Sequence, residues 1–449
     1  MKELDNKTFS LEYNTRLPGF VNGKPTYLVS LDGKIRQARQ SCPTCGHAVY
    51  VDNGYHVVQD SMISSLGLTI KIAQFCCKRC GSFWSSHRDL IDSFIKKEKE
   101  FVKSLMLGCV RSGLSLERAS STVGEITGVN YSPQYVYELY VSALEQVKNE
   151  RAASASGVYY YDEQYILENG KEACRLTVRD QVTGKILHDK KDVDAQEAAI
   201  MCALHEALDG LPVEAFTIDM ARGYPAIIAK LYPNARIQWC IFHLYKLIWK
   251  ELTDECGKNP ALIQLYNAYS LFNIFFDHSI ALKKLEELLA RFQRWRAGDQ
   301  KSDLEIEKGL REEFRSFVKS QKKQRRREGT NVPRRTLQES TQIFEEIKQQ
   351  AALFPKILQK RIRRIDEYWD RFTLFQRDLR VQPTNNGMEQ YFAATLAKTN
   401  KKDFRSANAV IRELRACQAE WNGQRLFSTT TLAEVLSLAG MLFLAFPPG

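Results

Sequence analysis

The sequence has no apolar run long enough to cross a membrane. The longest candidate, residues 432–446, is too short and contains Glu434. The N-terminal residues are polar and lack the apolar core of a secretory signal peptide. Acidic residues are also scarce, because 53 Asp and Glu stand against 64 Lys and Arg, giving a net charge of +11. These absences favour a cytoplasmic protein with no membrane partner, and the excess positive charge favours a polyanionic partner such as nucleic acid.

The composition is that of a globular protein. Of the 449 residues, 44% are hydrophobic and 26% are charged, which leaves room for several domains. The positive charge is uneven, since residues 151–250 hold 12 basic and 13 acidic residues, whereas residues 251–380 hold 27 and 20. A near-neutral stretch beside a basic one is the arrangement that a nuclease needs, with carboxylates at the catalytic site and cations around that site to attract the nucleic acid.

The cysteine pattern predicts a metal site. Eleven cysteines, an odd number in a chain without a signal peptide, argue against a disulfide framework. Four of them form two matched Cys-x-x-Cys-Gly turns, Cys42/Cys45 and Cys77/Cys80, which predict a structural Zn²⁺ bound in a zinc ribbon. Unrelated or redox-active pairs are the alternative. Three nearby side chains are possible substitute ligands: Cys76, His47 and His87.

The next stretch has the pattern of helices. Ser115 is a good N-cap for a helix that Gly128 ends, and Ser132-Pro133 starts the following helix. Two helices joined by a glycine-containing turn suit a helix-turn-helix module that reads DNA, although an ordinary helical hairpin has the same pattern. The first turns of the second helix carry the side chains expected to reach base edges: Gln134, Tyr135 and Tyr137.

The near-neutral stretch alternates strands and helices. Strands are expected at 157–166, 173–183, 186–188, 214–219 and 236–242, and helices at 195–208, 225–231 and 243–252. The order β-β-β-α-β-α-β-α is that of an RNase H-like fold. Asp162 lies in the first strand and Asp219 ends the fourth, and in this topology these two strands are neighbours at the centre of the sheet. Their carboxylates would converge and hold Mg²⁺, whereas either Asp alone is common at a strand end.

A third carboxylate is expected at the start of a later helix. Glu389, in the segment QPTNNGMEQYFAATLAK, follows Asn386 by three residues. The same Asn-x-x-Glu spacing is a capping box, so the local sequence does not decide between a helix cap and a metal ligand.

Four ordered features resemble the DDE/D-type transposases of bacterial insertion sequences, especially those related to Mutator-like elements. They are Asp162-Glu163 after a hydrophobic strand, Asp219 between AFTI and Gly223-Tyr224, the Cys-x-x-His of Cys240 and His243, and Thr-Asn-Asn-x-x-Glu ending at Glu389. The resemblance covers about residues 157–400, and the zinc ribbon and helix-turn-helix upstream are similar to the DNA-end-binding region of such enzymes.

The resemblance implies an enzyme that cleaves element-end DNA and joins it to target DNA by two-metal-ion phosphoryl transfer. Asp162, Asp219 and Glu389 would bind Mg²⁺ or Mn²⁺. It further implies a homodimer on double-stranded DNA and a nucleoid-associated location in bacteria. Possible supporting residues in the active site are Cys240, His243 and Asn386. An equally good interpretation of the first two is structural: a buried cysteine at a strand end and a histidine at the start of a helix.

Between Asp219 and Glu389 lie 169 residues, far more than the core fold needs, and residues 257–380 among them are helical in pattern, which agrees with the all-helical insertion that the resemblance implies. A run of charge is usually a solvated face, but beside a nuclease core we expect phosphate contacts. The residues expected to make them are Lys322, Lys323, Arg325, Arg326, Arg327, Arg361, Arg363 and Arg364.

The expected fold class is α/β, with an RNase H-like mixed-sheet core, a large all-α insertion, a zinc ribbon and a helical DNA-binding module. The expected boundaries are an unassigned segment at 1–40, the ribbon at 41–92, the helical module at 93–150, the core at 155–252 and 381–449, and the insertion at 253–380. Two other functions are considered: a non-enzymatic DNA-binding regulator derived from a transposase, and an RNase H-like nuclease that does not join ends. A regulator would have lost a triad carboxylate, and all three are present.

Overall fold

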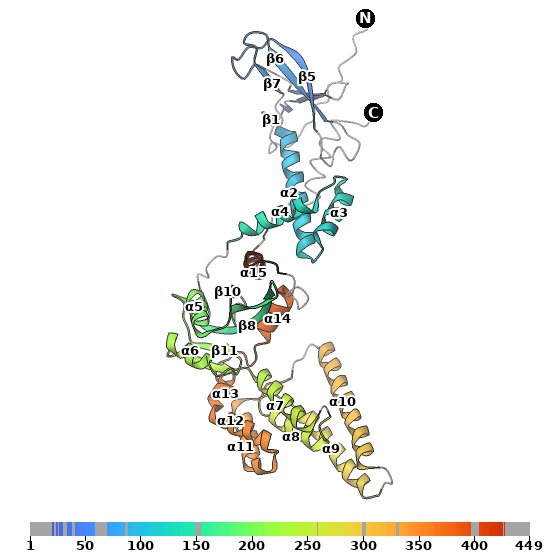
Figure 1. Ribbon diagram of the computed structural model, residues 1–449, viewed down its shortest axis with the longest axis vertical. Helices are drawn as coiled ribbons and strands as arrows, with labels where there is room; N and C mark the ends of the chain where they lie inside the picture. The colour runs from blue at the N-terminus through green and yellow to red at the C-terminus, as the bar shows by residue number, and fades with distance from the viewer. Residues whose placement is uncertain are drawn as a thin grey trace. The chain divides into compact units, whose positions relative to one another are not determined.

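The computed structural model describes residues 20–21, 24–25, 27–29, 34–37, 41–58, 70–85, 89–148, 154–257, 259–298, 302–328, 332–396, 404–424 and 426. The chain divides into two compact units, one of residues 1–147 with 424–449 and one of residues 148–423 (Figure 1). Within the described residues, no helix combines the length and the apolar character that a membrane span requires.

The first unit contains a small β-sheet. Its strands are β1 (Phe20–Val21), β2 (Lys24–Pro25), β3 (Tyr27–Val29), β4 (Lys34–Gln37), β5 (Tyr50–Val58), β6 (Ile70–Cys77) and β7 (Phe83–Ser85). β1 pairs with β2, and the others form a sheet in the order β3-β4-β6-β5, with β7 also paired to β6. Because β6 ends at Cys77, the sheet itself fixes where the second cysteine turn begins.

Three helices follow, α2 (Asp89–Arg111), α3 (Leu116–Thr127) and α4 (Pro133–Glu145). The predicted caps are present. Ser115 accepts a hydrogen bond from the Arg118 amide at 3.3 Å, and Gly128 ends α3 with φ of 69°. Ser132 accepts a hydrogen bond from the Tyr135 amide at 3.1 Å at the start of α4. The three helices bury a common apolar cluster, which includes Val102, Met106, Ala119, Val123 and Val136.

The second unit is built on a five-stranded mixed sheet. Its strands are β8 (Val158–Glu168), β9 (Lys171–Asp180), β10 (Ile186–Asp192), β11 (Ala215–Ile218) and β12 (Arg236–Trp239), in the order β10-β9-β8-β11-β12. β9 is antiparallel to both β8 and β10, whereas β11 is parallel to both β8 and β12. The predicted adjacency of β8 and β11 is present. Several bounds differ from the prediction: β10 runs to Asp192 instead of residue 188, β11 ends just before Asp219, and β12 ends at Trp239 because a helix starts at Ile241.

Helices lie against both faces of this sheet: α5 (Glu197–Leu208), α6 (Tyr224–Leu231), α14 (Asn386–Thr395) and α15 (Ala407–Trp421). Successive residues of a strand point to opposite faces. Tyr159 and Tyr161 therefore join the core that contains Leu204 of α5, whereas Tyr160 packs against Met388 of α14. In Figure 1, α14 lies beside the sheet, and it contacts β8 directly.

Between β12 and α14 the described chain is almost entirely helical, as its pattern predicts. The helices are α7 (Ile241–Cys256), α8 (Leu262–Phe272), α9 (Ser279–Arg296), α10 (Asp303–Glu328), α11 (Leu337–Gln349), a 3₁₀ turn (Ala351–Leu353), α12 (Lys356–Glu367) and α13 (Trp369–Arg377). Leu265, Leu285 and Leu310 join α8, α9 and α10 in a small core of their own. The helices α11 to α13 instead pack onto the core of the sheet, through residues such as Phe344 and Phe372.

A fully buried ion pair lies between the sheet and α14. Arg175 of β9 donates to both carboxylate oxygens of Asp189 of β10, at 2.7 and 2.6 Å, and neither side chain is exposed. Tyr391 of α14 donates to the same carboxylate at 2.5 Å, and Arg175 also donates to Thr395 at 3.1 Å. A buried charge is costly unless it is paired, so this network is satisfied only when α14 lies in its observed position.

Removing one partner of this pair should destabilise the protein strongly. In Asp189→Ala, the Arg175 guanidinium stays buried without its counter-charge, and we expect a loss of roughly 3–5 kcal/mol in the free energy of unfolding. The neighbouring Lys190 is the control, because its ion pair with Glu206 is exposed on both sides, and Lys190→Ala should cost less than about 1 kcal/mol. Urea titration followed by circular dichroism measures both. Equal losses in the two variants would contradict the role given to the buried pair.

Candidate catalytic centre and metal-binding cysteine cluster

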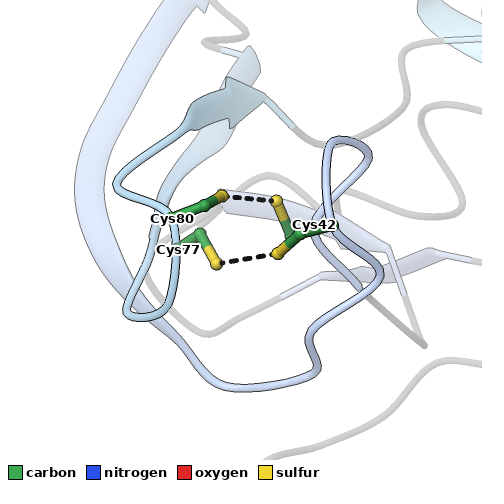
Figure 2. A group of neighbouring side chains, drawn as sticks. Cys42, Cys77 and Cys80 are labelled. Atoms are coloured by element: carbon green, nitrogen blue, oxygen red, sulfur yellow. Dashed lines mark hydrogen bonds between the residues drawn. The ribbon is translucent and has the colours of Figure 1, made fainter.

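The four cysteines of the two matched turns meet at one point. Figure 2 shows the sulfur atoms of Cys77 and Cys80 on one loop directed toward Cys42 on the other. All four sulfurs lie within 4.8 Å of one another, with 3.5 Å between Cys42 and Cys80 and 3.7 Å between Cys45 and Cys77. Four thiolates arranged tetrahedrally at Zn–S distances of about 2.3 Å stand about 3.8 Å apart. The cluster therefore fits a four-coordinate zinc ion with no open position.

Both turns use the same backbone conformation. In each, the glycine amide donates to the carbonyl of the first cysteine, at 2.8 Å for Gly46 and 3.0 Å for Gly81. Both glycines have left-handed φ angles, 69° and 73°, which a β-carbon disfavours. Of the possible substitute ligands, Cys76 and His47 do not belong to the cluster, and His87 lies outside the described residues.

Strand pairing brings the two aspartates to neighbouring positions. In the parallel register of β8 and β11, Thr217 lies opposite Tyr160. Asp162 is two residues further along β8, and Asp219 directly follows the end of β11 at Ile218. Alternate residues share a face of a sheet, so Asp162 belongs to the face that carries Tyr160, and Asp219 lies close enough for its charge to raise the pKa of Asp162. The face that carries Tyr160 is the one against which α14 packs, and both aspartate side chains are half-buried.

Helix α14 carries Glu389. The N-cap of α14 is Asn385, and its side chain makes no capping hydrogen bond; it donates instead to the carbonyl of Tyr161 at 3.4 Å. The capping box that the sequence allowed is therefore not formed. The Glu389 carboxylate is exposed and pairs with Lys246 of α7 at 3.0 Å.

The first turn of α14 approaches the sheet closely because residue 387 is glycine. A β-carbon at Gly387 would lie 2.9 Å from the ring of Tyr160 and 3.2 Å from the guanidinium of Arg179. Arg179 also donates a hydrogen bond to the Gly387 carbonyl. The segment two residues before Glu389 is thus held against both β8 and β9.

Burial and neighbouring negative charge shape the chemistry of this site. Loss of hydration raises the pKa of Asp162 to about 8; the hydrogen bond from the Glu163 amide opposes this rise, and the charges of Asp219, Glu163 and Glu389 add to it. Burial also raises the pKa of Glu163, whose carboxylate accepts a hydrogen bond from the Tyr161 hydroxyl at 2.7 Å. Clustered carboxylates are the oxygen ligands that Mg²⁺ and Mn²⁺ prefer, and a cation would relieve their repulsion.

The Cys-x-x-His segment lies against the same site. Cys240 is buried immediately before α7, and its sulfur accepts a hydrogen bond from the Asn385 amide at 3.2 Å. His243 is half-buried; burial lowers its pKa, while the charges of Asp219 and Glu389 act in the opposite direction. Two buried polar atoms, His243 Nδ1 and Asn385 Oδ1, have no hydrogen-bond partner among the described residues. A hydrated divalent ion would supply such partners, so the residues present fit one.

The three carboxylates do not form a closed cage here. Among the described residues, the four cysteines are the one group of three or more His, Cys, Asp or Glu side chains whose ligand atoms lie close enough to share an ion. Glu389 differs from the two aspartates because it is exposed and its charge is balanced by Lys246.

The basic end of α10 lies near the start of α14. Lys322, Arg325 and Arg326 line a pocket of about 700 Å³ together with Asn386, the first residue of α14. Lys323 and Arg327 are exposed on the same helix. The pocket therefore connects a cationic surface to a residue only three positions before Glu389.

The basic residues of α12 differ among themselves. Arg361 is buried and makes two hydrogen bonds to the carboxylate of Glu251, which speaks against the phosphate contact expected for it. The guanidinium of Arg364 lies over the ring of Trp239 at 5.2 Å and over that of Tyr368 at 5.9 Å. Arg363 is exposed. The three residues form one cluster in sequence, but the helix turns them toward different neighbours.

The residues expected to read DNA are exposed at the start of α4. Gln134, Tyr135 and Tyr137 all face solvent, and Val136 between them is buried in the three-helix cluster. The Tyr135 ring stacks on that of Tyr131, with 5.9 Å between the centroids.

Sequence reasoning missed the residues that hold Glu389 in place. Lys246 follows His243 by one helical turn, a spacing that could have suggested it. Arg179 and Gly387 have no such signal, because their contact joins positions 208 residues apart.

Comparison with known proteins gives one full-length relative. No family model matches the sequence. The chain is 21% identical over 437 residues to an uncharacterized 48.3 kDa protein of insertion element ISM1 from Methanobrevibacter smithii, covering 95% of this chain and 93% of that protein. Among solved structures, the trimeric form of the HTLV-2 integrase catalytic core domain with magnesium is 13% identical, at a TM-score of 0.17, over 24% of this chain and 80% of that chain. A simian T-cell lymphotropic virus intasome in complex with PP2A regulatory subunit B56 gamma is 12% identical, also at 0.17, over 34% of this chain and 64% of that chain. TM-scores of this size do not establish a common fold.

Zinc should depend on the clustered cysteines alone. We expect metal analysis to find one zinc ion per chain, and X-ray absorption to find four sulfur ligands at about 2.3 Å. Cys77→Ser should lose the zinc and, with it, the fold of the ribbon. Cys76→Ser, altered at the adjacent residue outside the cluster, should retain both. Zinc loss in both variants, or in neither, would refute the assignment.

The raised pKa of Asp162 predicts a pH-dependent stability. In the unfolded chain this carboxyl ionises near its ordinary pKa of about 3.9, whereas in the folded protein it holds its proton up to about pH 8. Ionisation therefore favours the unfolded state, and its cost grows as the pH rises between these two values.

Without added Mg²⁺ or Mn²⁺, Asp162→Asn should thus raise the melting temperature more at pH 8.5 than at pH 5. Asp254→Asn, at an exposed aspartate, is the control and should show no such difference. Thermal unfolding at both pH values measures the effect. A gain for Asp162→Asn that is the same at the two pH values would contradict the raised pKa.

Proposed function

We propose that the protein is a DNA transposase of the DDE type, which cleaves element-end DNA and joins the freed end to target DNA. The observation that carries the proposal is the parallel pairing of β8 and β11, because the charges of Asp219 and of Glu389 on α14 both act on Asp162. The full-length relative is, by its name, a protein of an insertion element, which supports the same function. The RNase H-like strand order is a suitable framework for it.

In this proposal Asp162, Asp219 and Glu389 hold Mg²⁺ or Mn²⁺, which when bound supplies nucleophile activation and charge neutralisation for phosphoryl transfer. The residues of the chain itself position the reaction. Lys246 balances the charge of Glu389, and the neutral imidazole of His243 can hydrogen-bond a phosphate oxygen or a water at its free Nδ1. Asn385 and Cys240 tie the start of α14 to β8 and α7.

DNA binding is divided between two regions in this proposal. The first turns of α4 read base edges in the major groove through Gln134, Tyr135 and Tyr137. Five residues near the end of α10 and one on α12 contact phosphates: Lys322, Lys323, Arg325, Arg326, Arg327 and Arg363. Arg361 and Arg364 are left out, because one is buried with Glu251 and the other lies against aromatic rings.

A nuclease that cuts without joining ends is the second candidate, because the same carboxylates serve both reactions. A DNA-binding regulator is less well supported, since Asp162, Asp219 and Glu389 are all retained. Incubating the protein with pre-cut element-end DNA and a plasmid target separates the two enzymes. Strand-transfer products support the transposase, and cleavage without such products supports the nuclease.

Each triad carboxylate should be essential for chemistry but not for DNA binding. Asp162→Asn, Asp219→Asn and Glu389→Gln should each lower Mg²⁺-dependent cleavage by at least about 100-fold, the scale on which loss of one electrostatic partner of a transition state acts. Affinity for element-end DNA should stay within about twofold, because none of the three residues is expected to contact bases. Asp254→Asn is the control for both assays. Full cleavage by any one triad variant removes that residue from the catalytic set.

A further inference from the structure

Helices α7, α8 and α10 enclose a groove of about 810 Å³. Six of its sixteen lining residues are Lys or Arg, and none is Asp or Glu. The groove thus carries a concentrated positive charge, although its exposed surface is mainly apolar. A ligand that suits both properties must be anionic and must also present flat or apolar surfaces.

The apolar part of the groove is aromatic. Phe242 and Trp249 stand two helical turns apart on α7, about 10.5 Å along the helix axis, and 38% and 42% of their surfaces are exposed. Lys246 lies between them, with its ammonium 4.4 Å from the centre of the Phe242 ring. Trp249 has no aromatic or cationic partner among the described residues, so its ring is available to a ligand.

The cations of the groove are largely unneutralised. Lys250, Lys319 and Lys322 form no ion pair with any described residue. Arg311 and Arg315 donate to the carbonyl and side-chain oxygens of Asn259, which carry no charge. These side chains keep their full positive charge for an anionic ligand.

The groove also leads to the candidate catalytic centre. Lys246 of the groove pairs with Glu389 at 3.0 Å. Lys322 of the groove also lines the adjoining pocket that contains Asn386, the first residue of α14. A strand in the groove would therefore have its sugar-phosphate backbone close to the helix that carries Glu389.

Double-stranded DNA suits the positive charge of the groove but not its aromatic rings. Its phosphates can meet the cations, but its bases stack on one another and cannot lie on Trp249 or Phe242. An unpaired strand offers phosphates at regular intervals and free base faces, which stack on aromatic side chains with little dependence on sequence. The combination of exposed aromatic rings and largely unpaired cations therefore selects unpaired over paired DNA.

We propose that this groove, between α7, α8 and α10, binds an unpaired segment of DNA, with bases stacked on Trp249 and Phe242 and phosphates on the surrounding lysines and arginines. The role of a strand bound beside Glu389 rests on the proposed transposase function, but the binding itself does not depend on catalysis. Unpaired DNA arises wherever a strand is cut or displaced next to the cleavage site.

The test compares two tryptophans of equal exposure. Trp249 lies in the groove and Trp295 lies outside it on α9, and each is 42% exposed. The probe is a fluorescent twelve-nucleotide oligothymidine, titrated onto the full-length protein without divalent ions, beside a duplex of the same length. Trp249→Ala should weaken oligothymidine binding roughly 5- to 100-fold, the range for loss of one base–aromatic stack. Duplex affinity should change less than about twofold, and Trp295→Ala should change neither.

Two further variants separate stacking from folding and from charge. Trp249→Phe keeps an aromatic face and should restore most of the affinity, which a merely misfolded protein would not. Lys250→Gln with Lys319→Gln should weaken binding and reduce its salt dependence, because each single-strand phosphate that is no longer neutralised by the protein lowers the slope by about 0.7. An oligoglutamate of equal charge should bind at least tenfold more weakly than oligothymidine, since it has no bases.

Several results would overturn the proposal: equal losses by Trp249→Ala on both DNAs, equal effects of the two tryptophan variants, or oligoglutamate binding as tight as oligothymidine. Glu389→Gln distinguishes this proposal from the catalytic one, because it should retain oligothymidine binding while losing cleavage. A protein that cleaves DNA but does not bind oligothymidine refutes the groove alone. One that binds it but never cleaves element-end DNA refutes the transposase function alone.

Discussion

Two aspartates on adjacent parallel strands concentrate negative charge on one face of the sheet, and the surrounding structure has to accommodate it. The pairing of Thr217 with Tyr160 brings the end of β11 next to β8, and the charges of Asp219 and Asp162 interact there. Burial and the repulsion of neighbouring carboxylates raise the pKa of Asp162 to about 8, so this carboxyl keeps its proton at lower pH. Lys246 pairs with Glu389, and no ion pair of either aspartate is found among the described residues. The site is therefore short of positive charge, which is the condition in which a divalent ion binds most favourably.

Helix α14 is positioned by the sheet and not by the chain that precedes it. The long helical segment between β12 and α14 imposes little on where α14 lies, because closing a longer loop adds only slowly to the entropic cost. Contacts across the sequence do the positioning instead: Tyr391 donates to Asp189, and Arg179 donates to the Gly387 carbonyl. A hydrophobic contact would tolerate sliding along the helix axis, whereas these hydrogen bonds require particular atoms to meet.

Features that rest on neighbouring residues could be predicted from the sequence, and features that rest on distant partners could not. The caps at Ser115 and Ser132 and the cysteine turns are local, so their residue types and spacing were sufficient. The strand order followed from the alternation of elements. Whether Glu389 capped its helix depended on Asn385 bonding to Tyr161, a contact between positions 224 residues apart. Arg361 was expected to contact phosphate because it belongs to a run of basic residues. Its actual partner, Glu251, lies 110 residues away, and no pattern within α12 reveals it.

The uneven charge of the chain follows from the same chemistry. Carboxylates repel a phosphodiester, so DNA can approach them only if cations elsewhere attract it more strongly. Here those cations lie on α7 and α10, in the groove and at the basic end of α10, and not on the strands that carry the aspartates. In the proposed function, phosphates would neutralise these cations and leave the carboxylates for a metal ion. Carboxylates placed directly beside the cations would pair with them instead, as Glu251 of α7 does with Arg361 of α12, and would leave neither available.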